Sequence, residues 1–90
     1  MPRLLVAEDS RLSRRIVANG LREAGYDVTE AADGALALEL FRQSPPDCVV
    51  TDLLMPNMTG QELLEHVRAT DSDMPVIIAS ADIQASSRST

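Results

Sequence analysis

The sequence contains no lysine and no tryptophan, so all eight of its basic residues are arginines. Phenylalanine and tyrosine occur once each, and the hydrophobic core must therefore be aliphatic. The one cysteine, Cys48, cannot form a disulfide within the chain, and its apolar surroundings predict a small buried thiol. No signal-peptide pattern and no apolar run of membrane-spanning length is present. Together with the single thiol, this favours a cytoplasmic location and no membrane partner.

Length and charge narrow the function classes further. Ninety residues make one small domain, and an apolar content of 44% is ordinary for a folded protein. The formal net charge of −6 disfavours direct binding to the nucleic acid backbone. The composition therefore indicates a single folded domain without direct nucleic acid binding.

Short apolar segments alternate with amphipathic ones along the chain. Strands are expected where short runs are rich in aliphatic or β-branched residues, at 3–7, 48–51 and 76–79. A further strand, nearer an edge of the sheet, is expected at 26–31, where apolar and polar residues loosely alternate. Helices are expected where apolar residues recur at helical spacing, at about 11–24, 35–43 and 61–69. This alternation with short links predicts an α/β fold, a doubly wound parallel sheet with right-handed crossovers and helices on both faces.

Helical periodicity also predicts which residues of the first helix face the sheet. The expected core face consists of Ile16, Val17, Gly20, Leu21 and Ala24. The residues expected in solvent are Arg14, Arg15, Arg22 and Glu23. Glycine inside a helix costs about 1 kcal/mol relative to alanine, so close packing of Gly20 against the sheet is expected.

Three other side chains allow more than one interpretation. Leu36 and Leu40 lie four residues apart on the second helix, and they form either the edge of the core or a partner surface. His66 stands alone on the third helix, without a second histidine or a cysteine at ligand spacing. We therefore expect a surface histidine rather than a metal ligand.

Polar side chains follow three of the four expected strands. Glu8 and Asp9 follow the first strand, Asp52 follows the third and Ser80 follows the fourth. The carboxyl ends of parallel strands meet at one edge of the sheet, where such folds bind ligands. Three carboxylates there repel one another unless a cation is present, and an all-oxygen set suits Mg²⁺.

A carboxylate beside Mg²⁺ is a suitable nucleophile for phosphoryl transfer, because the metal neutralises charge on the transferring group. Asp52 is the expected nucleophile, and the Ser80 hydroxyl is placed to hydrogen-bond a phosphoryl oxygen. The structural alternative is that Asp52 merely caps the turn that follows it.

These residues stand in an order and spacing that resemble the receiver domain of two-component response regulators, of the single-domain CheY-like type. The matching segments, which together span residues 3 to about 82, are 5–10, 14–17, 32–34, 52–56 with Gly60, and 75–78 leading into 80–81. The resemblance implies a flavodoxin-like fold with five βα units, of which this sequence contains the first four strands and three helices.

The resemblance also implies a role for each matching residue. Asp52 matches the phosphoacceptor, which takes a phosphoryl group from a sensor histidine kinase or a histidine phosphotransfer protein. Glu8, Asp9, Asp52 and the backbone carbonyl of Leu54 match the groups that hold Mg²⁺, and Ser80 matches the switch hydroxyl. Such a domain signals by conformational switching. It catalyses only its own phosphorylation and dephosphorylation and is not an enzyme acting on other molecules.

The sequence departs from the family after the fourth strand. Receivers continue with a helix, a fifth strand ending in Lys-Pro and a last helix, none of which is present in residues 1–90. Three interpretations stay open: a piece of a longer receiver, a fragment that completes itself by dimerisation or strand exchange, and a naturally short protein. The second follows from the bare apolar edge that residues 76–79 would present to another chain.

Two other functions compete with the switching phosphoacceptor. A receiver without its lysine and fifth strand would act as a dimerisation or docking module that cannot switch. A small haloacid-dehalogenase-like phosphatase also uses an aspartate at a strand end. Those enzymes carry a second aspartate two residues later, however, and position 54 is leucine.

Overall fold

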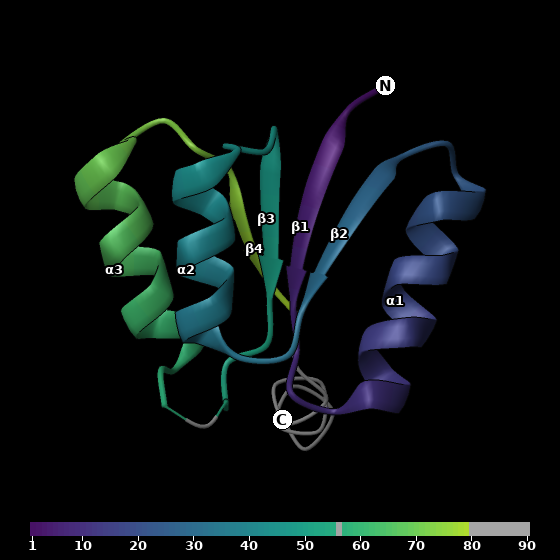
Figure 1. Ribbon diagram of the computed structural model, residues 1–90, viewed down its shortest axis with the longest axis horizontal. Helices are drawn as coiled ribbons and strands as arrows, with labels where there is room; N and C mark the ends of the chain where they lie inside the picture. The colour runs from purple at the N-terminus through teal and green to yellow at the C-terminus, as the bar shows by residue number, and fades with distance from the viewer. Residues whose placement is uncertain (56, 80–90) are drawn as a thin grey trace, which may run out of the picture.

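A computed structural model describes residues 1–55 and 57–79 of the chain. Figure 1 shows α2 and α3 side by side and α1 on the other side of the sheet. None of the helices in these two ranges is long and apolar enough to cross a membrane. The elements are β1 (Arg3–Ala7), α1 (Arg11–Glu23), β2 (Asp27–Ala31), α2 (Gly34–Gln43), β3 (Cys48–Thr51), α3 (Gly60–Thr70) and β4 (Val76–Ile78).

The four strands form one parallel sheet in the order β2-β1-β3-β4. This order puts β1 and β3 at the centre of the sheet, so each of them is paired on both sides. The predicted doubly wound arrangement is confirmed. The fourth strand ends at Ile78, one residue earlier than expected, and the second begins at Asp27 rather than at residue 26.

Two hydrophobic clusters fill the space on either side of the sheet. The larger cluster lies under α2 and α3, where Phe41, Leu63 and Val67 pack against Leu5 and Val49. The smaller cluster lies under α1 and contains Leu4, Val6, Ala18, Val28 and Val50. Alternate residues of β1 thus point to opposite clusters, which explains the unbroken apolar run of that strand.

The buried face of α1 differs from the prediction. Ala18 is the fully buried residue of this helix, with Val17 and Leu21 packed beside it. Ile16, expected in the core, is 63% exposed, because a residue two positions from Ala18 lies on the opposite side of a helix. Close packing of Gly20 was also wrong, since a Cβ built there would meet nothing within 4 Å.

Each helix begins at a polar N-cap. Ser10, Asp33 and Thr59 accept hydrogen bonds from backbone N–H groups in the first turns of α1, α2 and α3. Thr59 and Glu62 form a reciprocal capping box, which satisfies two backbone donors that a helix start leaves free. The helix starts next to the sheet's carboxyl edge are thereby fixed.

Four side chains outside the fully buried core were also the subject of sequence-based expectations. Cys48 is half-buried rather than buried, and its partial burial raises the pKa of the thiol. Leu40 packs against the core while Leu36 is exposed, so only Leu40 marks the core's edge. His66 is exposed on α3, as expected.

Candidate functional site

Glu8, Asp9 and Asp52 meet at the carboxyl edge of the sheet. Because Ala7 of β1 lies opposite Thr51 of β3, the residues that follow these two strands emerge side by side. The Asp52 N–H donates to the Ala7 carbonyl at 2.9 Å, and the Glu8 N–H donates to the Ala31 carbonyl at 3.0 Å. One oxygen from each carboxylate lies within 4.8 Å of the other two.

Neighbouring backbone groups orient two of these carboxylates. The Ser10 N–H donates to Glu8 Oε1 at 3.0 Å, and the Leu53 N–H donates to Asp52 Oδ1 at 2.9 Å. The buried Thr51 hydroxyl donates to the Asp52 carbonyl at 2.9 Å and so fixes the main chain at that point. The side-chain geometry therefore depends on short local contacts made where the strands end.

Gly60 closes the loop that follows Asp52. Its N–H donates to the Leu53 carbonyl at 2.8 Å, and a Cβ at this position would overlap the Asp52 carbonyl oxygen. Glycine is therefore required here for close approach of the start of α3 to the end of β3. The loop residue Asn57 has a φ of 70°, a left-handed conformation that asparagine adopts more readily than most residues.

The electrostatics of the cluster are unfavourable for three charges. Desolvation, helped by the negative charge of Asp52, raises the pKa of Glu8 to about 7, against an opposing hydrogen bond from the Ser10 backbone. In water alone, a proton on Glu8 relieves part of the repulsion near neutral pH. A bound cation would relieve it in the same place and would favour the ionised form.

The donor set fits Mg²⁺. The cluster contains only carboxylate oxygens, and Asp9 is exposed while Glu8 and Asp52 are half-buried. Mg²⁺ prefers oxygen ligands, uses one or two carboxylates and keeps several waters, which an open edge of this kind allows. Within the described ranges, this trio is the one group of three or more potential ligands close enough to share an ion.

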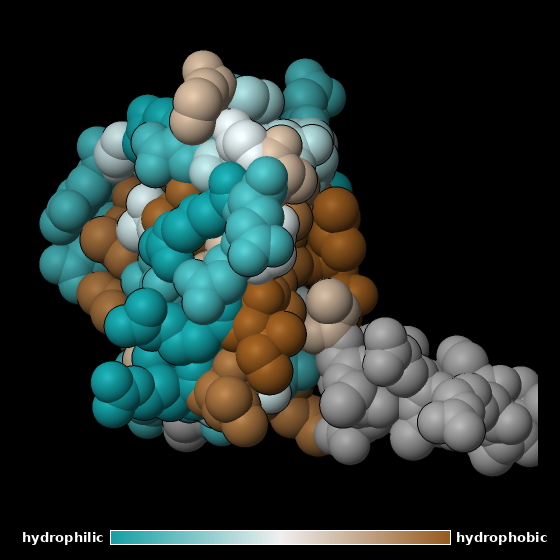
Figure 2. Space-filling view, turned by 90° about the vertical axis from the view of Figure 1, so that its right-hand side faces the viewer, coloured by the Kyte–Doolittle hydropathy of each residue, from teal (hydrophilic) through white to brown (hydrophobic). Residues whose placement is uncertain are grey.

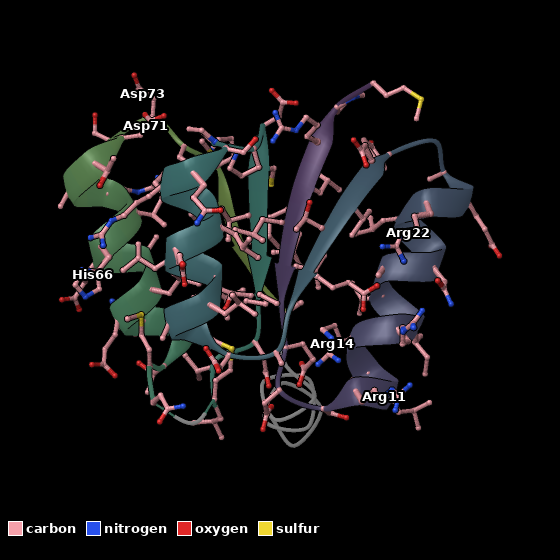
Figure 3. All side chains as sticks on the ribbon, in the orientation of Figure 1. Arg11, Arg14, Arg22, His66, Asp71 and Asp73 are labelled. Carbon is pink, nitrogen blue, oxygen red and sulfur yellow. The ribbon has the colours of Figure 1, made fainter. Side chains whose placement is uncertain are left out.

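The structure does not test the roles predicted for Leu54 and Ser80. Leu54 follows Asp52 by two residues and its side chain is 55% exposed, but the role of its carbonyl stays a prediction. Ser80 lies outside the described residues, as does Pro56 of the segment that follows Asp52. Figure 3 shows His66 on the outer side of α3, away from the carboxyl edge.

One residue near the site was missed by the sequence analysis. Arg14 was expected in solvent, but its side chain is only 15% exposed and donates from Nη1 to the Glu8 carbonyl at 2.9 Å. The available signal was its position four residues after the N-cap Ser10, on the same stripe as the buried Ala18.

Comparisons with known proteins agree with the geometry. The family described as "Response regulator receiver domain" matches residues 4–90. The response regulator MprA of Mycobacterium sp. (strain KMS) is 37% identical over 86 residues, which is 96% of this chain and 37% of that protein. The chain therefore spans little more than a third of the length of this curated relative.

Two solved structures share the fold. The response regulator TrrA of Thermotoga maritima, in complex with Mg²⁺-BeF, is 32% identical with a TM-score of 0.87 over 90% of this chain and 70% of that one. The chemotaxis protein CheY4 of Vibrio cholerae is 30% identical with a TM-score of 0.83 over 99% of this chain and 79% of that one. The fold, the carboxylates at the edge of the sheet and the family match agree with one another, and the chain belongs to the response regulator receiver domain family.

Proposed function

We propose that Asp52 is the phosphoacceptor of this receiver domain and takes a phosphoryl group from a histidine of a sensor kinase or phosphotransfer protein. The observation that carries the proposal is the meeting of Glu8, Asp9 and Asp52 at two neighbouring strand ends. Two findings support it: the chain's family, and the Mg²⁺-BeF complex of its structural relative TrrA.

The transfer forms one bond and breaks another. An Asp52 carboxylate oxygen attacks phosphorus, a P–O bond forms, and the P–N bond to the donor imidazole breaks. The imidazole leaves with the bonding electron pair and takes up a proton. When bound, Mg²⁺ would neutralise charge on the phosphoryl oxygens, with Glu8, Asp9 and Asp52 as the side chains that hold it.

Two further groups complete the proposed site. The Leu54 carbonyl follows Asp52 closely enough in sequence to act as a fourth protein ligand of Mg²⁺. The Ser80 hydroxyl follows β4 and would bond the phosphoryl group, which makes it the switch residue. Residues 1–90 would then supply the first four strands and three helices of a receiver domain, an assignment that stays a prediction.

Intact mass before and after incubation with a small-molecule phosphodonor tests the proposal. We expect one phosphoryl adduct that requires Mg²⁺ and disappears in Asp52→Asn. Asp73→Asn is the matched control, because Asp73 is exposed in the loop after α3 and distant from the cluster (Figure 3). Uptake that survives Asp52→Asn would refute the assignment, and Mg²⁺ binding without uptake would favour the non-switching docking module.

We also propose that the edge of β4 is a pairing surface for a second copy of this chain. Among the described residues β4 is an edge strand, and Ile77 on it is 55% exposed. Ile77 lies opposite Val50, so it points to the same face of the sheet as the α1 cluster. An apolar edge strand of this kind readily pairs with another chain.

A further inference from the structure

Arg14 holds the main chain on both sides of Asp9. Its backbone N–H donates to the Ser10 carbonyl at 2.8 Å, the hydrogen bond that opens α1. Its guanidinium Nη1 donates to the Glu8 carbonyl at 2.9 Å. The residue between these two carbonyls is Asp9, whose carboxylate belongs to the acidic cluster.

The Glu8 backbone is consequently fixed at both of its polar groups. Its N–H donates to the Ala31 carbonyl of β2, and its carbonyl accepts from Arg14. At Glu8, Arg14 bonds the backbone carbonyl and not the side-chain carboxylate, so it leaves the acidic oxygens of the cluster free. Its effect on the cluster is therefore one of position, transmitted through the main chain.

A carboxylate on β2 holds the guanidinium in place. Arg14 Nε lies 3.3 Å from Glu30 Oε1, and the Glu30 side chain is only 18% exposed. Arg22, which lies further along α1 toward its C-terminus, pairs with the other oxygen, Glu30 Oε2, at 3.0 Å. Figure 3 shows Arg14 between α1 and the lower end of β1, with Arg22 higher on the same helix.

The geometry of the arginine fork explains why this residue type is needed. Two separate nitrogens of one planar group reach the Glu8 carbonyl and the Glu30 carboxylate at once. An ammonium group, as in lysine, is a compact point charge without that fixed two-directional geometry. Arg15 also approaches Glu30, at 3.8 Å, but its side chain is 55% exposed, and in the described structure it forms no hydrogen bond or ion pair with Glu8.

We propose that Arg14, anchored by Glu30, is a positioning residue for the metal site: it holds the Glu8–Ser10 segment so that Asp9 and Glu8 face Asp52. This inference rests on the proposed Mg²⁺ site. Groups that hydrogen-bond the ligands of a metal, without touching the metal, typically contribute 10- to 100-fold to metal affinity. Arg14 does so here through the backbone that carries two of the carboxylates.

Isothermal titration with Mg²⁺ alone tests the inference on the 90-residue chain. We expect Arg14→Met to weaken Mg²⁺ binding by about 10-fold or more, while Arg15→Met binds as the unchanged chain does. Arg14→Lys retains the charge but has one donor nitrogen in place of the two that Arg14 uses, so it should bind Mg²⁺ with an affinity between those of the unchanged chain and Arg14→Met. Amide hydrogen exchange should accelerate at Asp9 and Ser10 in Arg14→Met but not in Arg15→Met.

The outcomes separate this inference from the proposed function. If the unchanged chain does not bind Mg²⁺, the metal site itself fails. If it binds Mg²⁺ and folded Arg14→Met binds equally well, the positioning role is overturned while the metal site stands. Should Arg14→Met not fold, judged by circular dichroism, Arg14→Lys decides: an affinity equal to that of the unchanged chain would overturn the role.

Discussion

At the scale of single residues, Glu8 carries the most unusual charge state. Burial and the neighbouring Asp52 raise its pKa from 4.5 to about 7. Between these two values the folded chain holds a proton that the unfolded chain has already released. Without a cation, the contribution of Glu8 therefore lowers the free energy of unfolding as pH rises from about 4.5 to 7, and the loss is complete above pH 7.

Replacing Glu8 by glutamine removes this penalty. In the presence of a chelator we expect Glu8→Gln to raise the melting temperature at pH 8 and to raise it less at pH 5.5. Thermal melts followed by circular dichroism measure both values, with Glu23→Gln at the exposed end of α1 as the control. An equal shift at the two pH values would show that Glu8 does not titrate between them.

The sequence allowed the carboxylates of the site to be predicted, but not the contact that Arg14 makes with one of their backbones. Glu8, Asp9 and Asp52 could be identified because they lie within two residues of the end of an apolar strand, a pattern that is local in the sequence. The contact of Arg14 with the Glu8 carbonyl depends on how α1 lies against β2, which no local pattern specifies. Its burial reverses the usual expectation for a charged residue, since pairing with Glu30 offsets the loss of water.

At the scale of elements, two helical glycines have opposite effects on stability. Gly20 lies inside α1 with open space where a Cβ would stand, whereas Gly60 opens α3 against the Asp52 carbonyl. We expect Gly20→Ala to raise the free energy of unfolding by about 1 kcal/mol, because alanine is the better helix former. Gly60→Ala should lower it, because the loop after β3 must shift to avoid overlap with backbone.

Urea unfolding of the two alanine variants measures both changes, and each serves as the other's control. Because Gly60 contacts the main chain of Asp52, its variant should also lose Mg²⁺ affinity, while Gly20→Ala should keep it. Equal stability of the two variants would contradict the close approach of α3 to the end of β3.

The positions of the helices and strands along the sequence were largely predictable, but the buried face of α1 was not. Strands and helices were located within a residue or two, because period and length distinguish short apolar runs from amphipathic ones. The face of α1 was wrong because Ile16 is more hydrophobic than Ala18, yet the small alanine is the one that permits close packing on the sheet. Periodicity alone does not tell which of two overlapping stripes is buried.

At the scale of the whole molecule, the sheet faces differ in how they are covered. Two helices pack on one face of the described sheet and α1 alone packs on the other. Figure 2, seen from the α1 side, shows hydrophobic surface beside hydrophilic residues. Among the exposed large hydrophobic residues are Leu12 on α1 and Ile77 on β4.

This uneven coverage leads to a prediction about association. If the β4 edge pairs with a second copy, sedimentation should show a concentration-dependent dimer of the 90-residue chain, and Ile77→Lys should weaken it. Leu12→Lys is the matched control, because Leu12 is 71% exposed but lies on α1 rather than on the edge strand. A chain that stays monomeric, or a dimer weakened only by Leu12→Lys, would rule out pairing through β4.

The most direct test of the central claim is to find which residue carries the phosphoryl group. After incubation with Mg²⁺ and a phosphodonor, borohydride converts an aspartyl phosphate to homoserine, which peptide sequencing by mass spectrometry locates. We predict homoserine at position 52, dependent on Mg²⁺ and absent from chelator-treated samples. Homoserine at another position, or none in a sample that carries the phosphoryl adduct, would contradict the assignment of Asp52 as the phosphoacceptor.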